Sequence, residues 1–322
     1  MEIIRNLKVP TGNILICRGE HGLLECLSLG DYGAHVNLNQ GKKVVHQQLL
    51  PLEEKWVITI STQYGCSMGC TFCDVPKVGP GKNATYNDMI DQFALAVKLH
   101  PEVKETKRLN VHFARMGEPT WNEEVLSVAR TFAEQPQLNI HPVVSTMMPR
   151  RGYGLLDFID EWMFIKNVQF EGNAGLQLSI NSTDEEERDK MFRGNALHLA
   201  SISDIMSRVA SPVGRKITLN FAVADYKIDA EYLAKLFSPE HFIVKLTPMH
   251  RTLTALDNGI MTLGDYTEAY PYKEHEYNLK KAGFEVLVFI ASREEDLGRI
   301  TCGNAILSGT IPLVPFTEES VG

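Results

Sequence analysis

The sequence predicts an α/β fold, in which a partial (β/α)6 barrel carries a small β-rich appendage at its N-terminus. From Trp56 onward, short apolar runs alternate with helical patterns, which is typical of βα units around a parallel sheet. About six such units fit a partial barrel better than a closed barrel of eight. The first 55 residues instead show apolar runs separated only by turn signals. We therefore expect a β-rich unit over 1–55, a barrel over 56–310 and a solvated tail over 311–322.

The composition is that of a globular protein with a large core, since 44% of the 322 residues are hydrophobic and 22% are charged. The net charge of -8 gives no overall positive field that would attract nucleic acid. The sequence contains no run of 18 apolar residues, which a membrane-spanning helix would need, and the N-terminus lacks the apolar segment of a signal peptide. The six cysteines are too scattered for a disulfide framework. We expect a soluble protein of the reducing cytoplasm.

Three apolar runs in the N-terminal unit predict strands, at residues 13–17, 22–29 and 34–38. Gly-Asp and Gln-Gly pairs between these runs are turn signals. We interpret this unit as a lid or appendage on the barrel.

The first helix of the barrel is predicted where apolar residues from Tyr86 to Val97 recur with helical spacing. Thr85 precedes this helix as an N-cap, and Asp88 follows three residues later as in a capping box. Further helices are predicted at 122–134, 200–210, 229–237 and 268–282. The barrel strands are predicted at 57–62, 109–114, 140–145, 175–180, 217–223, 242–247 and 284–290. In such folds, the chemistry gathers at the C-terminal ends of the strands.

Cys66, Cys70 and Cys73 have the spacing C-x3-C-x2-C directly after the first predicted barrel strand. Three thiolates in one short loop can hold three irons of a 4Fe-4S cluster, and no fourth cysteine lies nearby for the last iron. An open iron can chelate amino and carboxylate groups, which is how S-adenosylmethionine (SAM) is held and reductively cleaved. A structural zinc site prefers four nitrogen or sulfur ligands, and the sequence offers no second pair. The spacing is similar to the signature of the radical SAM superfamily.

Polar residues follow several of the predicted strands. Gly117 and Glu118 follow the second strand, where glycine lets the backbone approach a ligand and a carboxylate can accept hydrogen bonds from an ammonium group. The alternative is an ordinary turn. Ser145, Ser179 and Asn181 end the next two strands, where they can bind a ribose or carboxylate, or cap the following turns.

Other candidate residues have a plain structural alternative. Phe72 lies inside the cysteine loop, although phenylalanine is more often a core residue. Cys302 closes the last predicted segment, where a buried structural thiol is the commoner role and a catalytic thiol is the alternative. His46, His112 and His250 are either core or surface histidines or members of the site.

The chain resembles the RlmN/Cfr-type adenosine methyltransferases of ribosomal RNA, a group within the radical SAM superfamily. The resemblance covers roughly residues 45–305, at Ser61 to Cys73, Met116 to Pro119 with Asn122, Ser145-Thr146, Ser179 with Arg188-Asp189, and Cys302-Gly303. It implies that Cys66, Cys70 and Cys73 bind the cluster. It also implies that Gly117, Glu118, Ser145 and Ser179 contact SAM, and that Cys302 carries a methyl group taken from SAM.

The chain departs from this family at four positions. Thr59 stands where the family has a second cysteine that resolves a covalent protein–RNA adduct, and a hydroxyl is far less nucleophilic than a thiolate. His46 stands at a family glutamate, and an imidazole can also move a proton near neutral pH. Asn181 and His250 stand at the SAM-contacting histidine and asparagine. The family's helical RNA-binding region is replaced by the β-rich unit.

The resemblance predicts a radical SAM enzyme that cleaves SAM to a 5′-deoxyadenosyl radical. It implies a reductant such as flavodoxin or ferredoxin as a partner, and no membrane. One outcome is methyl transfer to an RNA base with Cys302 as the methyl carrier. The alternative is a non-methylating radical reaction on a nucleotide, peptide or small metabolite, which the missing thiol at Thr59 favours. An iron–sulfur electron carrier is the remaining hypothesis, but it needs neither Glu118 nor a barrel.

Overall fold

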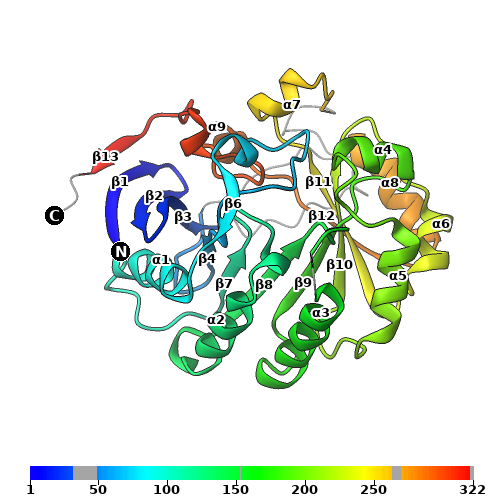
Figure 1. Cartoon of the computed structure of the whole chain (residues 1–322), viewed down its shortest axis with the longest axis horizontal. Helices are drawn as coiled ribbons and strands as arrows, with labels where there is room; N and C mark the ends of the chain where they lie inside the picture. The colour runs from blue at the N-terminus through cyan, green and yellow to red at the C-terminus, as the bar shows by residue number, and fades with distance from the viewer. Residues whose placement is uncertain (32–48, 153, 263–269, 320–322) are drawn as a thin grey trace.

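The computed structural model describes residues 1–31, 49–152, 154–262 and 270–319, and most of its strands form a single sheet (Figure 1). In spatial order, the strands of this sheet are β12 (Glu285–Val288), β11 (Phe242–Pro248), β10 (Ile217–Val223), β9 (Gly175–Ser179), β8 (Ile140–Thr146), β7 (Leu109–Phe113), β4 (Trp56–Ile60), β3 (Gly22–Gly30), β2 (Gly12–Gly19), β1 (Glu2–Val9) and β13 (Thr317–Glu319).

The strands from β4 to β12 along this order are all parallel and form the partial barrel. The connections between them contain the helices α1 (Tyr86–Lys98), α2 (Glu124–Ala133), α3 (Leu155–Phe164), α4 (Glu185–Met191), α5 (Leu199–Arg208), α6 (Ala230–Leu236), α7 (Leu253–Asp257) and α8 (Tyr270–Lys281). Helix α7 lies beside the cysteine loop, since the Thr254 amide donates to Asp74 Oδ1 at 2.9 Å. The α/β fold with a partial barrel is therefore confirmed, and each predicted barrel strand lies within two residues of its observed bounds. Helices α3, α4, α7 and α9 (Arg293–Leu297) were not predicted.

The N-terminal strands extend the barrel sheet instead of forming a separate layer. Strands β1, β2 and β3 are antiparallel, and β3 pairs with β4 so that Leu27 lies opposite Thr59. Strand β1 was not predicted, and the strand predicted at 34–38 lies outside the described residues. The C-terminal residues are exposed as expected, yet β13 pairs with β1, and Arg5 Nε lies 2.7 Å from Glu318 Oε1. The division at residues 55 and 310 stays a prediction.

Helix α1 packs against strands β2, β3 and β4. Thr85 and Asp88 form the expected capping box, which satisfies two free N–H groups of the first turn. The buried face of α1 packs on a core that includes Cys17 and Cys26. The Cys26 thiol donates to the Gln92 carbonyl of α1 at 3.7 Å. Both cysteines are therefore core residues of the sheet.

A buried ion pair joins the N-terminal strands to the end of the barrel. Arg115, which follows β7, lies with Nη2 2.7 Å from Glu25 Oε2 on β3, and both side chains are almost fully buried. Glu25 Oε1 also accepts a hydrogen bond from the Leu307 amide, and Arg115 donates to the Arg299 carbonyl. The pair therefore holds the segment 299–307, which contains Cys302, against the sheet.

None of the helices in the described ranges is long and apolar enough to cross a membrane.

Candidate active site

A cavity of about 290 Å³ opens at the C-terminal ends of the parallel strands. It is lined by each predicted site residue that the structure describes, namely Cys66, Cys70, Cys73, Phe72, Gly117, Glu118, Ser145, Ser179, Asn181, His250 and Cys302. His46 lies outside the described residues. Residues that are separated by more than 200 positions in the sequence thus meet around one space.

The cysteine loop begins at a short hairpin of β5 (Gln63–Gly65) and β6 (Pro80–Asn83). Gly65 has φ +84°, and a Cβ on it would lie 2.1 Å from the Gly79 carbonyl oxygen, so only glycine fits this crossing. Burial raises the pKa of Cys66 to about 12, and it raises the pKa values of Cys70 and Cys73 well above the usual range. The neighbouring thiols raise the pKa values of Cys70 and Cys73 further.

These three thiols fit a cluster chemically. An iron ion stabilises the thiolate that burial disfavours, so the binding of iron would release the thiol protons. In the described part of the chain, no three His, Cys, Asp or Glu side chains converge where they would share a single metal ion. Cluster thiolates each bind a different iron of the cube and therefore stand apart.

Cys302 lies beside the cysteine loop. The Asp74 amide, directly after Cys73, donates to the Gly303 carbonyl at 2.8 Å. Gly303 has φ +86°, and a Cβ there would lie 3.3 Å from the Phe72 carbonyl oxygen. Cys302 faces the open cavity, so its side chain is accessible although protein surrounds it. This burial raises the pKa of the Cys302 thiol, and the positive charges of Lys245 and Arg115 oppose the increase.

Glu118 is a buried carboxylate that the surrounding backbone holds in place. It accepts hydrogen bonds from the Thr120 amide at 3.1 Å, the Thr120 hydroxyl at 2.9 Å and the Met147 amide at 2.9 Å. Burial raises its pKa, and these hydrogen bonds act in the opposite direction. Gly117 has φ +101°, and a Cβ on it would lie 2.6 Å from Gln63. Packing against the cysteine hairpin therefore requires this glycine, in addition to any approach of a ligand.

The polar residues at the next strand ends differ in how they are held. Thr146 caps the following turn, since its hydroxyl accepts from the Met148 amide at 2.9 Å. Ser145 accepts from Gln177 at 3.3 Å, and its side chain lines the cavity. Asn181 has φ +61°, and its Oδ1 accepts from the Ala222 amide at 2.9 Å, which fixes the side chain beside β10.

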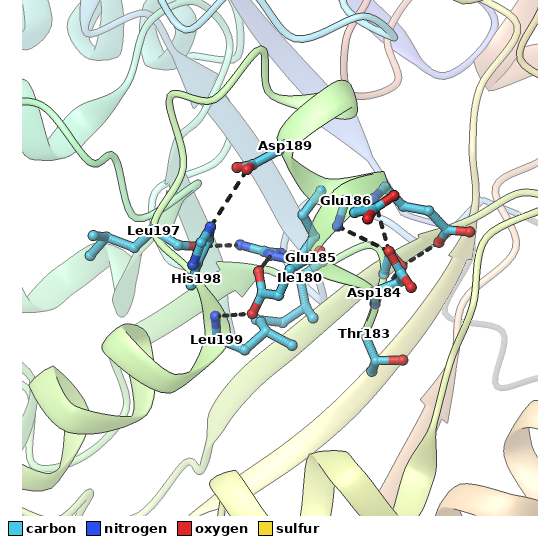
Figure 2. A network of polar contacts seen from close by, with 12 residues as sticks. Ile180, Thr183, Asp184, Glu185, Glu186, Asp189, Leu197, His198 and Leu199 are labelled. Atoms are coloured by element: carbon cyan, nitrogen blue, oxygen red, sulfur yellow. Dashed lines mark hydrogen bonds and ion pairs between the residues drawn. The ribbon is translucent and has the colours of Figure 1, made fainter.

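Arg188 of α4 is a structural residue, and Figure 2 shows three of its partners, Ile180, Glu185 and Leu197. It is almost fully buried, and it donates to the carbonyls of Ile180 and Leu197. Its Nε lies 3.6 Å from Glu185 Oε2, and burial lowers its pKa to about 10. Arg188 therefore anchors the turn that carries Asn181.

His250 and Phe72 close the cavity near Cys302. His250 Nδ1 lies 3.2 Å from Asp296 Oδ1 in α9 (Arg293–Leu297), and both side chains are buried. Phe72 is buried, and its ring meets that of Phe192 edge to face with the centroids 6.0 Å apart. The Thr252 hydroxyl donates to the Phe72 carbonyl at 2.7 Å. Both predicted residues thus have structural contacts in addition to their places in the cavity wall.

Thr59, which stands at the position compared above with a second cysteine, lines the cavity. No other cysteine of the chain supplies a second thiol there besides Cys302 and the cysteine loop. All six cysteines lie in the described residues. Besides the three cysteines of the loop, only Cys302 lines the cavity. Cys26 precedes Leu27, which faces the cavity, and therefore points to the opposite side of β3.

Sequence reasoning singled out Thr59 and His112 but missed three other polar residues deeper in the barrel, Gln177, Asn220 and Lys245. Thr59, His112, Gln177, Asn220 and Lys245 point inward from within the strands, and we call these five residues the cavity floor. The signal that would have revealed Lys245 is a single charge inside the apolar run of β11. Burial, followed by the charge of Lys245, lowers the pKa of His112 to about 3 and keeps its imidazole neutral.

Comparison with known proteins finds relatives over part of the chain, although no family model matches it. The chain is 28% identical to the dual-specificity RNA methyltransferase RlmN of Sulfurovum over 191 residues, which are 58% of this chain and 50% of that protein. It is 28% identical to the probable RlmN of Thermus thermophilus over 225 residues, which are 66% of this chain and 59% of that protein. The chain thus spans between half and two thirds of the length of these relatives.

The fold also has a solved counterpart. A radical SAM methyltransferase from Sphaerobacter thermophilus superposes with a TM-score of 0.66 and 20% identity, over 91% of this chain and 77% of that chain. The expected resemblance is therefore confirmed: the chain has the radical SAM fold and is related in sequence to the RlmN proteins.

Proposed function

We propose that this protein is a radical SAM enzyme, in which Cys66, Cys70 and Cys73 hold a 4Fe-4S cluster and SAM binds in the adjoining cavity. The observation that carries this proposal is the meeting of these three thiols with Glu118 and Cys302 around one space. When bound, the cluster supplies the electron that cleaves SAM reductively. Such a cluster would need a low-potential reductant as a partner, such as flavodoxin or ferredoxin.

The residues of the chain would bind and orient SAM. Glu118 Oε1 already accepts two hydrogen bonds from Thr120, so Oε2, which accepts one from the Met147 amide, is the oxygen that would accept a hydrogen bond from the SAM ammonium group. Ser145, Ser179, Asn181 and His250 supply hydroxyl, amide and imidazole groups for its other polar parts. Apolar side chains of the cavity wall, including Phe72 and the methionines 68, 147 and 249, would exclude water from the reaction.

We infer that the reaction uses at most one thiol of the chain besides the cluster ligands. In one outcome, the methyl group of SAM moves to the Cys302 sulfur, the thiol loses its proton, and S-adenosylhomocysteine leaves. The curated relatives are RNA methyltransferases, which favours an RNA base as the final acceptor. Without a thiol at Thr59 and with Cys17 and Cys26 in the core, however, no second thiol is available to resolve a covalent adduct.

A second candidate function is a non-methylating radical reaction on a nucleotide, peptide or small metabolite. The single accessible thiol favours it, and so does the net charge of -8, because RNA affinity draws largely on Lys and Arg at phosphates. In either case, the six free cysteines fit a reducing compartment such as the cytoplasm.

Two experiments test this function. The reduced, reconstituted protein should show an electron paramagnetic resonance signal that changes when SAM is added, whereas the signal of an electron carrier would not change. Incubation with methyl-labelled SAM then separates the outcomes by mass spectrometry of the Cys302 peptide, with Cys302→Ala as the control. A labelled Cys302 supports methyl transfer. An unlabelled Cys302 together with 5′-deoxyadenosine supports the non-methylating reaction.

A further inference from the structure

Lys245 is a cation inside the barrel, at the floor of the cavity. It points into the cavity from the middle of β11, and its Nζ lies 5.1 Å from the centroid of the Phe289 ring. Among the ion pairs of the described residues, none includes Lys245, whereas Arg115 in the same wall is paired with Glu25. A half-buried ammonium group without a counter-ion is costly, so a bound anion would stabilise it.

The acids nearest to this floor already make other contacts. Glu118 accepts three hydrogen bonds from its own loops, and Glu295 accepts one from the Ser292 amide at 2.6 Å in a capping box. Asp31 lies 2.9 Å from the Lys55 ammonium group. Burial lowers the pKa of Lys245, the negative charges of Cys302 and Asp31 raise it, and the positive charges of Arg215 and Lys55 lower it. The interior around Lys245 is therefore suited to an added negative charge.

A second, independent observation lies next to Lys245. Asn220 on β10 is the register partner of Lys245 on β11, so both side chains point to the same side of the parallel sheet. The Asn220 side chain is more than nine-tenths buried and lines the cavity, yet its Oδ1 has no hydrogen-bond partner in the described structure. Buried amides are rarely left in this state. The neutral imidazole of His112 also faces the same floor.

We propose that Lys245 binds an anionic group, a phosphate or a carboxylate, of the substrate that reacts beside Cys302, and that Asn220 Oδ1 accepts a hydrogen bond from a donor next to this group. The three ammonium protons of Lys245 can hydrogen-bond such a group, whereas Asn220 Oδ1 can accept a hydrogen bond from a hydroxyl or amino group next to it, and His112 can bind a neighbouring polar atom. The inference rests on the proposed function in one respect, because it takes the bound anionic molecule to be the substrate of the proposed reaction. It assigns the substrate to the class of phosphorylated or carboxylated molecules, anchored at the floor while the reacting carbon faces Cys302.

The test is isothermal titration calorimetry of the unreduced full-length protein, with and without SAM, using inorganic phosphate, acetate, adenosine 5′-monophosphate and neutral adenosine. We expect at least one anionic probe to bind and adenosine to bind more weakly than its monophosphate. Lys245→Met should weaken anion binding about 10- to 100-fold, the usual effect of a lost hydrogen bond to a charged group. The control Lys235→Met removes an exposed lysine of α6 and should change nothing.

A second variant keeps the test informative if Lys245→Met fails to fold. Asn220→Asp places a carboxylate beside Lys245, so it should abolish anion binding while the melting temperature stays the same or rises. The identity of the tightest probe then separates the sources: the monophosphate indicates a nucleotide, inorganic phosphate another phosphorylated molecule, and acetate a carboxylated molecule.

Failure of this inference is distinct from failure of the proposed function, because the titration needs no turnover. The inference is overturned if no anionic probe binds the wild-type protein, or if Lys245→Met or Asn220→Asp binds as tightly as wild type. Anion binding without SAM cleavage would contradict the proposed function alone.

Discussion

The outer ring and the floor of the same cavity are built differently. At the outer ring, Glu118 and Asn181 are held by hydrogen bonds from backbone amides, and the cysteine loop is tied to Gly303. At the floor, Asn220 and Lys245 have polar atoms without partners in the described residues. A preorganised outer ring fits a cofactor that is bound in one fixed way, whereas a floor with unused hydrogen-bonding capacity fits the substrate. The two regions should therefore respond differently to substitution.

The largest effect is expected at the cysteine loop. Cys70→Ser should remove one iron ligand and abolish both cluster assembly and SAM cleavage, as measured by iron content and by the visible absorption of the reconstituted protein. Cys26→Ala is the matched control, since Cys26 is buried outside the cavity. A normal cluster in Cys70→Ser would show that the loop does not hold it.

The two cations of the cavity wall sharpen the comparison. Glu25→Gln should destabilise the protein by about 3–5 kcal/mol in urea denaturation, because it leaves the buried Arg115 without its counter-ion. Lys245→Met should cost far less, since Lys245 has no ion pair to lose. Glu318→Gln, which breaks the exposed pair with Arg5, serves as a surface control with little effect. Equal losses at Glu25 and Lys245 would contradict the distinction between paired and unpaired cations.

Glu118→Gln tests the outer ring. It removes the charge that would bind the SAM ammonium group, so SAM affinity should fall about 10- to 100-fold, corresponding to the roughly 1.5–3 kcal/mol of a hydrogen bond to a charged group. Equilibrium dialysis with labelled SAM measures this change. The exposed Glu123→Gln provides the control. Unchanged SAM affinity in Glu118→Gln would place the ammonium group elsewhere.

The smallest effect concerns the thiol between the two regions. Because burial raises the pKa of Cys302, less of it is thiolate at pH 8 than for an ordinary exposed cysteine. Its alkylation by iodoacetamide should therefore be slower than that of a model thiol at pH 8, and should still increase above pH 9. Peptide mass spectrometry of the unreconstituted protein measures the rate. Complete, fast alkylation at pH 7 would mean that Cys302 is ionised.

Local signals in the sequence explain which parts of the fold were predictable. The strands of the barrel are short apolar runs, and the cap of α1 is a local pattern at Thr85 and Asp88, so both were found. The pairing of β1 with β13 joins residues about 310 positions apart, and no local signal reports it. The antiparallel extension of the sheet therefore emerged only from the structure.

The site divides in the same way. The cysteine loop, Gly117 and Glu118 are contiguous motifs, and each was predicted from its own residue types. The floor is not a motif, because Asn220 and Lys245 lie on different strands and become neighbours only through the register of β10 and β11. Likewise, only the structure shows that Cys26 points away from Thr59.

The most direct test of the central claim is the fate of SAM itself. The anaerobically reconstituted protein is mixed with SAM and dithionite, and the products are separated by liquid chromatography. We predict 5′-deoxyadenosine and methionine, formed with the wild-type protein and not with Cys70→Ser. Intact SAM in the presence of a fully assembled and reduced cluster would contradict the assignment as a radical SAM enzyme.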